Sequence, residues 1–301
     1  MTTAPRVSVV IPFRNDERTL VAAIDSVCRQ RWPAIELLLC NDHSDDASAV
    51  LASTRLAGET RIPWQMLQVT GHGAAAARNA GLAAMTGEWV AFLDADDRWE
   101  EQKLATCLDL ARSHGWMLVA HAERWQPEDG VGGRIVRYRQ LLDPTVPLVL
   151  SVYRQNPFST SAVVMHRSLV EAAGPFDEEL PSAEDFDYWL RVALVPGIRV
   201  GFVDDVLGTY TLRAGSESSR VDARHRAMLL IGDRYANAVR ALPGASPLER
   251  WRYRSRVRLA SGVRFAGAGR PIRGAALALA GLLQWPFRGD LVRYLLARRP
   301  S

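Results

Sequence analysis

Short apolar runs alternate with helical patterns over the first part of the chain. Residues 7–11 form a β-branched run followed by Pro12, and residues 35–40 form a second apolar run. Both runs are typical of buried strands. Between them, apolar residues recur at helical spacing from residue 20 to 28, and Asp16 is expected to cap that helix. The pattern therefore predicts a strand, a helix and a second strand.

The same alternation continues as far as residue 120. Helices are expected from about residue 47, over 74–85 and over 99–113, and strands over 64–69, 88–93 and 116–120. Strands that alternate with helices predict a mostly parallel sheet with helices on both faces. Beyond this region the pattern predicts a loop at 126–133, a strand at 161–166, a helix at 183–194 and a strand at 200–212. From residue 221 it is helical and rich in Arg, with breaks near 243–247 and 267–271, so we place a boundary near residue 220.

Polar clusters follow three of the predicted strands, at residues 12–15, 41–44 and 94–97. Each cluster alone is compatible with ordinary turns and helix caps. Ligands of parallel sheets bind beyond the carboxyl ends of strands, where neighbouring loops converge. Three clusters at successive strand ends therefore favour a binding crevice. His43 and His72 lie near it without an assigned role, and the six histidines show no metal-ligand spacing.

The composition is that of a globular protein. The 301 residues are 48% apolar, which is enough for a packed core. Cys28, Cys40 and Cys107 lie far apart and suggest neither a metal site nor a disulfide framework, so we expect buried, reduced thiols. The N-terminus lacks the basic stretch, apolar core and cleavage site of a secretory signal. These observations predict a cytoplasmic location.

Charge is distributed unevenly along the chain. The net charge is +4, but 16 Arg and only four acids lie beyond residue 220, so the first part is acidic. A basic tail suits an anionic lipid surface, nucleic acid or an acidic partner, and Arg-rich solvated helices have the same composition. Residues 274–287 are apolar apart from Gln284, yet are too few for a membrane span, which needs about 20 residues. This segment is expected to be a core helix or an interfacial helix.

Four segments of the chain together resemble a known family. They are residues 7–15 with 41–46, residues 77–82, residues 87–97 and residues 184–191. In this order and spacing they resemble family 2 glycosyltransferases, which share the GT-A nucleotide-sugar-binding fold. The resemblance implies an α/β, GT-A-like (Rossmann-like) domain over 1–220, with a nucleotide-sugar-binding half at 1–120 and an acceptor-binding half at 121–220. It fades in the helical, Arg-rich region 221–301.

The Asp-rich segment 94–97 is the donor and metal site that the resemblance implies. Asp94 would lie near the ribose, Asp96 would ligate the metal directly, and Asp97 would be a supporting or alternate ligand. A departing nucleoside diphosphate carries negative charge, and carboxylates hold the hard divalent ions, Mn²⁺ or Mg²⁺, that offset it. Asp97 is equally compatible with a cap on the following helix.

The same resemblance assigns the remaining donor contacts. Asp42 would accept the N–H of a uracil-like base, which favours UDP- or dTDP-sugars. Arg78 would pair with the diphosphate or the base. Pro12 and Phe13 would shape the base and ribose pocket through backbone and ring contacts.

Asp185 and Glu184 are the acceptor-side carboxylates. Asp185 matches the catalytic Asp of the family, which would take the proton from the attacking acceptor hydroxyl in an inverting displacement. Glu184 would position the acceptor or support Asp185. Taken without the other motifs, both are also explained as the acidic first turn of a helix.

Arg213 stands where family members often have a His near the metal. Arg cannot ligate a metal because it stays protonated. Either Asp96 and the phosphates alone hold the ion, or Arg213 contacts the diphosphate and takes over part of its electrostatic role. The resemblance thus leaves the metal requirement open.

Alternative functions are a non-catalytic nucleotide-sugar-binding or assembly protein of the same fold, and a nucleotidyltransferase. The latter usually has a Gly-rich phosphate loop after the first strand, and residues 12–18 contain no glycine. The expected acceptor is a saccharide or a lipid-linked sugar in cell-surface polysaccharide or glycolipid synthesis. An anionic membrane surface is a possible partner of the basic region at the inner face of the membrane, and no nucleic acid is expected.

Overall fold

The computed structural model describes residues 4–213 and 220–284, and these residues form two compact units. The first unit contains the described residues of 4–142, 156–179 and 184–213. The second contains 143–155, 180–183 and 220–284. The C-terminal helices thus share their unit with a short segment from the middle of the chain.

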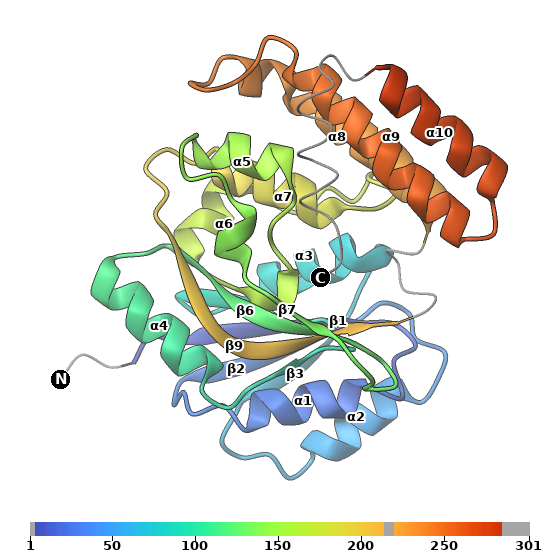
Figure 1. Ribbon diagram of the computed structural model, residues 1–301. Coiled ribbons are helices and arrows are strands. Elements are labelled where there is room, and N and C mark those ends of the chain that lie inside the picture. The colour runs from blue at the N-terminus through green and yellow to red at the C-terminus, as the bar shows by residue number, and fades with distance from the viewer. Residues whose placement is uncertain (1–3, 214–219, 285–301) are drawn as a thin grey trace. The chain divides into compact units, whose positions relative to one another are not determined.

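One sheet runs through the first unit (Figure 1). Its strand order is β3-β2-β1-β4-β8-β6-β9-β5, and β7 pairs with β6. The strands are β1 Val7–Phe13, β2 Ile35–Asn41, β3 Trp64–Gln68, β4 Trp89–Phe92, β5 Arg98–Trp99, β6 Leu118–Pro127, β7 Arg134–Val136, β8 Val163–His166 and β9 Val200–Leu212. The β3-β2-β1-β4 half is parallel, whereas β8 is antiparallel to both of its neighbours. The carboxyl ends of β1, β2 and β4 therefore lie at the same edge.

Helices cover both faces of the parallel half. Alternate strand residues, such as Val9 in β1 and Leu37 in β2, join one core with α1 (Leu20–Cys28), α2 (Ser48–Leu56) and α4 (Lys103–His114). On the opposite face, α3 (Gly73–Ala84) packs on β1 and β2, as Figure 1 shows. Gly81 permits this close packing, since a Cβ there would lie 2.4 Å from Val10 Cγ1. β1 is accordingly buried along its whole length.

Two predicted boundaries near the crevice are wrong. β1 continues through Pro12, which lies beyond Val10, the last β1 residue paired with β4, so its missing N–H disrupts no pairing with that strand. Trp99 belongs to the short strand β5, and the helix expected from Trp99 begins at Lys103. The polar residues 94–97 consequently lie in a turn between two strands and not at the start of a helix.

Residues 121–220 contain elements that the sequence pattern did not predict. They are β7, α5 (Leu148–Arg154), α6 (Arg167–Ala173) and 3-10 turns at Tyr138–Leu141 and Thr160–Ala162. The predicted loop at 126–133 is shorter than expected, because β6 includes Gln126 and Pro127. The helix α7 (Glu184–Ala193) has the expected acidic first turn.

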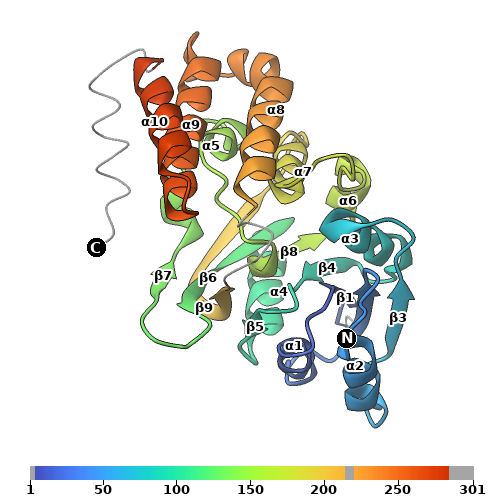
Figure 2. The ribbon, with the colours of Figure 1, turned by 90° about the vertical axis from the view of Figure 1, so that its right-hand side faces the viewer.

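The second unit is helical. Figure 2 shows α8 (Val221–Arg240), α9 (Glu249–Gly267) and α10 (Pro271–Leu283) side by side, and α5 packs on α8. The Tyr153 hydroxyl from α5 donates a 2.8 Å hydrogen bond to the Gly232 carbonyl of α8. Among the helices that the structure describes, none is both long enough and apolar enough to cross a membrane. The cysteines Cys28, Cys40 and Cys107 are free and buried, as predicted.

Candidate functional site

The Asp-rich turn after β4 is held by two partners from distant parts of the chain. Asp97 is 1% exposed, and its carboxylate accepts hydrogen bonds from the Ser161 hydroxyl (2.6 Å) and the Thr211 backbone N–H (2.8 Å). The Asp94 N–H in turn donates to Ser161 Oγ at 3.0 Å. Because both Asp97 oxygens are used inside the protein, this residue fixes the turn. The cap interpretation of Asp97 is wrong, since α4 begins only at Lys103.

Asp94 and Asp96 are the more accessible carboxylates of this turn, with 28% and 23% of their side chains exposed. Burial, followed by the charge of Asp94, raises the pKa of Asp96 to about 6. Burial and the charges of Asp96 and Asp94 raise the pKa of Asp97 as well. The turn thus concentrates negative charge that the protein compensates only in part. Such a set of oxygen donors fits a hard divalent cation.

Arg213 at the end of β9 is the nearest cation to Asp96. Its Nη1 lies 2.8 Å from Asp16 Oδ1 and 3.6 Å from Asp96 Oδ2. Asp16 does not cap α1 as expected: the residue before that helix is Thr19, and the Asp16 carboxylate pairs with Arg213 and the Arg14 N–H. Arg213 therefore lies beside Asp96, the predicted metal ligand. It is bonded to Asp16, which was expected to cap a helix.

Arg78 links the Asp-rich turn to the first turn of α7. Its guanidinium is buried and donates to Asp94 Oδ1 at 2.8 Å and to Glu184 Oε1 at 2.7 Å. Burial opposes its charge, but Asp94 and Glu184 raise the pKa of Arg78 overall. The resemblance implied that Arg78 would pair with the diphosphate or the base. In the structure both terminal nitrogens are bonded to carboxylates.

Asp185 lies beside Glu184 in the first turn of α7. Its Oδ2 accepts a weak 3.4 Å hydrogen bond from Asn156 Nδ2, and its Oδ1 accepts from the Phe186 N–H at 2.7 Å. The charges of Asp97, Asp94, Asp96 and Asp185 all act on the Tyr210 hydroxyl, whose pKa is raised, mainly by burial. The Tyr210 ring stacks on Trp125, with centroids 4.9 Å apart. One tyrosine thus faces both groups of carboxylates.

Asp42 follows β2 and is 4% exposed. Its Oδ2 accepts a 2.9 Å hydrogen bond from the Gly73 N–H at the start of α3, which ties it to the positive end of that helix. Its Oδ1 is buried and has no hydrogen-bond partner among the described residues. A buried carboxylate oxygen of this kind is available to a donor N–H of a ligand.

Two histidines accompany Asp42. Asp42, His43 and His72 each offer a ligand atom within 4.8 Å of the others, so the three could hold a metal ion. His43 has a left-handed φ of 53° and its Nε2 contacts the Gly71 carbonyl at 3.0 Å. With the Nε2 proton donated there, Nδ1 keeps a lone pair, as in many metal-binding histidines. Neither histidine has a role that follows from the family motifs.

Pro12 and Phe13 belong to the buried part of β1. The Phe13 ring is 3% exposed and lies in the core, whereas its carbonyl accepts a 2.9 Å hydrogen bond from the Asp42 N–H. The expected ring contact with a ligand is therefore unavailable in this arrangement. Through this hydrogen bond, the Phe13 backbone positions Asp42.

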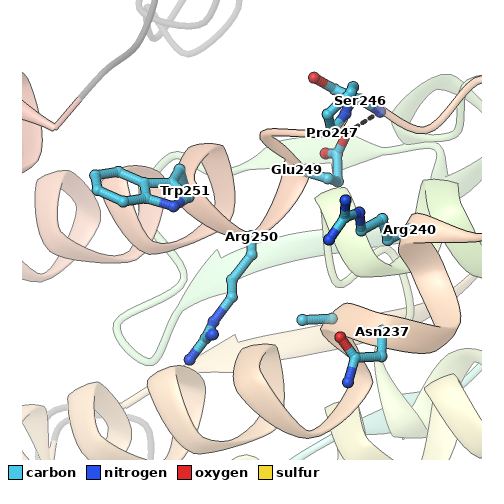
Figure 3. Close-up of a pocket in the computed structure, with 8 residues that line it drawn as sticks. Asn237, Arg240, Ser246, Pro247, Glu249, Arg250 and Trp251 are labelled. Carbon is cyan, nitrogen blue, oxygen red and sulfur yellow. Dashed lines mark hydrogen bonds between the residues drawn. The ribbon is translucent and has the colours of Figure 1, made fainter.

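A separate hollow of about 180 Å³ lies in the second unit, where α8 ends and α9 begins (Figure 3). Two of its charged groups are paired: Glu249 binds Arg154 at 3.0 Å, and Arg250 binds Asp233 at 2.8 Å. Figure 3 also shows the bond from the Ser246 N–H to Glu249. These ion pairs hold the helix ends together, so the hollow does not compete with the crevice as the functional site.

The fold, with polar side chains beyond the carboxyl edge of its parallel strands, defines a class of protein: α/β proteins that bind a ligand at this edge. Residues 8–170 match the family model of Glycosyl transferase family 2. The chain belongs to this family and is a glycosyltransferase, which confirms the predicted resemblance.

Two curated relatives align with most of the chain. Glycosyltransferase AglE of Haloferax volcanii is 27% identical over 218 residues, which are 71% of this chain and 70% of AglE. The UDP-Glc:alpha-D-GlcNAc-diphosphoundecaprenol beta-1,3-glucosyltransferase WfgD of Escherichia coli is 27% identical over 220 residues, 71% of this chain and 79% of WfgD.

Solved structures confirm the GT-A-like fold. The mannosyltransferase PcManGT of Pyrobaculum calidifontis, in complex with GDP-Man and Mn²⁺, has a TM-score of 0.64 at 18% identity, covering 98% of this chain and 80% of that one. Residues 1–349 of S. aureus TarS give 0.61 at 17% identity, with 94% and 93% covered. Against the longer TarS chain the match spans 87% of this chain and 44% of TarS.

Proposed function

We propose that this protein transfers a sugar, with inversion, from a UDP- or dTDP-sugar to a hydroxyl of a saccharide or lipid-linked acceptor. The observation that carries the proposal is the linkage of two carboxylate groups by Arg78. One group, Asp94 and Asp96, suits a cation and a diphosphate; the other, Glu184 and Asp185, suits a hydroxyl that must lose a proton.

The donor base would be bound at Asp42. Its Oδ1 is buried and accepts no hydrogen bond from the described residues, although His72 Nδ1 lies 3.8 Å from it, so it can accept the N–H that uracil and thymine present between two carbonyls. A guanine base offers a different arrangement of donors. The choice of UDP or dTDP over GDP is thus a prediction from one acceptor oxygen, and a nucleotide titration tests it directly.

A divalent ion, Mn²⁺ or Mg²⁺, would be held by Asp96 and Asp94 and would offset the charge of the departing diphosphate. Burial and then the charge of Asp94 raise the pKa of Asp96, and a bound cation would offset both effects. Asp97 would support these ligands by fixing the turn through Ser161 and Thr211. The Asp42, His43 and His72 group is a second candidate, and its imidazoles suit softer ions such as Zn²⁺.

Arg213 would contact the donor diphosphate. It lies 3.6 Å from Asp96 and is held by Asp16, so its charge is available at the same place as that of the ion. A guanidinium binds phosphate oxygens through paired N–H donors. Arg213 would thus offset part of the diphosphate charge that the metal ion would otherwise offset alone.

Asp185 would be the general base. It takes the proton of the acceptor hydroxyl while that oxygen bonds to the anomeric carbon, and the bond from this carbon to the diphosphate breaks with its electron pair on the leaving group. Asn156 orients Asp185, and Arg78 holds Glu184 next to it. We therefore assign Arg78 a positioning role in place of a direct contact with the diphosphate.

The acceptor would belong to cell-surface polysaccharide or glycolipid synthesis. The name of WfgD specifies a diphosphoundecaprenol-linked acceptor, and another Escherichia coli relative, WcaA, is named for colanic acid biosynthesis. A lipid-linked acceptor would bring this enzyme to the cytoplasmic face of the membrane.

The test is calorimetric titration with UDP, dTDP and GDP, each with and without Mn²⁺, on wild type and Asp96→Asn. Asp109→Asn on the exposed side of α4 is the matched control. We expect metal-enhanced binding of UDP or dTDP that Asp96→Asn weakens and Asp109→Asn does not. Absence of diphosphate binding in every condition would refute the donor site.

A further inference from the structure

One exposed side of α10 is apolar. Its residues recur at helical spacing: Ile272, Ala275, Ala276, Leu279, Leu282 and Leu283. Arg273, also exposed, is outside this set and pairs with Asp222. We call this set the outer face of α10. Ile272 is 87% exposed, Leu279 57% and Leu283 78% among the described residues. Exposed large apolar side chains that adjoin one another mark interaction surfaces, whereas isolated ones are ordinary.

The inward side of the same helix is formed by small residues. A Cβ on Gly274 would lie 2.6 Å from the Gly262 carbonyl of α9, and one on Gly281 would lie 2.9 Å from Leu259 Cγ. Helices of water-soluble domains normally direct large apolar residues inward and polar ones outward. Here glycines make the contact between α9 and α10, and leucines face outward. Close packing through small residues, with apolar residues outside, is the arrangement of helices that adjoin lipid.

The three C-terminal helices carry an excess of positive charge. Residues 220–284 contain thirteen Arg, no Lys and three acids, namely Asp222, Asp233 and Glu249. Each acid is already bound by two arginines. A second copy of this chain would bring the same positive charge to the contact, whereas anionic lipid headgroups complement it. Charge therefore favours a lipid surface over self-association.

We infer that the outer face of α10 inserts into the interfacial layer of an anionic membrane, with the helix axis parallel to the membrane plane. Thirteen residues make a helix of about 20 Å, too short to cross the hydrocarbon layer. A helix with an apolar side and neighbouring arginines lies at the headgroup boundary. Only the benefit of membrane binding to the enzyme rests on the proposed function, because a lipid-linked acceptor would be found at that surface.

The experiment uses the full chain with one added thiol, Leu279→Cys, carrying an environment-sensitive dye. The matched control is Val50→Cys on α2, where Val50 is 69% exposed. The native cysteines are buried, and the unsubstituted chain measures any labelling of them. Vesicles contain phosphatidylcholine alone or with roughly 30% phosphatidylglycerol. We expect dye emission at 279 to rise about threefold with the anionic vesicles only, and no change at position 50.

Vesicle flotation supplies the second measurement. The double variant Ile272→Asn/Leu279→Asn should bind anionic vesicles about tenfold more weakly than wild type, while Val50→Asn binds normally. Unchanged emission at 279, or equal binding to neutral vesicles, would overturn the inference. The inference would also fail if these substitutions dissociated a dimer, or if the outer face of α10 became exposed only after residues 285–301 were removed. UDP titration of the same variants separates this outcome from failure of the donor site.

Discussion

Arg78 in α3 and Glu184 at the start of α7 form a buried ion pair with an N–O distance of 2.7 Å, although 106 residues separate them in sequence. The other terminal nitrogen of Arg78 binds Asp94. The Asp-rich turn and the first turn of α7 are thus linked through one buried cation. Under the proposed function, these segments hold the donor and the acceptor, and Arg78 contributes to their relative position.

Replacing Arg78 should lower the stability of the folded protein. Arg78→Met leaves two carboxylates without their cation, so the free energy of unfolding should fall by about 3–5 kcal/mol in urea titrations. The double variant Arg78→Met/Glu184→Met should recover part of that loss, because one unpaired charge is removed with it. If Arg78→Met kept wild-type stability but bound UDP tenfold more weakly, Arg78 would be a direct donor ligand.

Replacing Asp185 should affect turnover without affecting the donor. Asp185→Asn cannot take the acceptor proton, so we expect kcat to fall by roughly 10²–10⁴-fold while the Kd for UDP stays within twofold. Glu171→Gln, an exposed change on α6, is the control for both measurements. A parallel loss of UDP affinity would show that Asp185 shapes the donor site and is not simply the base.

Arg213 and a metal ion should compete for Asp96. Arg213→Gln removes the positive charge that lies 3.6 Å from Asp96 Oδ2. Affinity for Mn²⁺ in the absence of nucleotide should therefore rise by about fivefold, and affinity for UDP without metal should fall by a similar factor. Calorimetry of both titrations checks the pair of changes. Arg213 would be a merely structural partner of Asp16 if neither affinity moved.

The two histidines next to Asp42 allow a test of metal selectivity. His72→Ala should abolish binding of Zn²⁺ at this group while leaving UDP-dependent Mn²⁺ binding intact, because carboxylates alone form the other site. Asp42→Asn should weaken both Zn²⁺ and UDP. Loss of Mn²⁺ binding in His72→Ala would place the cofactor at the histidines and not at Asp96.

The parallel half of the sheet could be predicted from the sequence because β1, β2 and β4 are buried on both faces and their ends are marked by polar clusters. Local patterns report such features directly. The family motifs added the fold and the residues at the strand ends. They could not show which partner each side chain binds.

The site contacts that were missed are those made over long distances in sequence. Asp16 has the local features of a helix cap, but its carboxylate binds Arg213, 197 residues away. Asp97 likewise precedes a helical pattern, yet it is fixed by Ser161 and Thr211. Periodicity and spacing describe neighbours along the chain, so pairings of this kind emerge only once the strands are placed side by side.

Lys103 is buried at the start of α4. Its exposed fraction is 0%, and its ammonium nitrogen lies 3.4 Å from the centroid of the Trp99 ring, with no hydrogen-bond partner among the described residues. Burial lowers the pKa of Lys103 from 10.5 to about 7, against the opposing influence of Cys107 and Glu123. A charged form is therefore costly in the folded protein.

The stability of the protein should depend on pH through this residue. Between about pH 7 and 10 the unfolded chain binds the Lys103 proton and the folded protein does not, so the contribution of Lys103 to stability rises with pH. Lys103→Met removes the buried charge and should be more stable than wild type at pH 6 by on the order of 3 kcal/mol. Urea titrations should show this difference shrinking as the pH approaches 10. A stability difference independent of pH would mean that Lys103 does not titrate in this range.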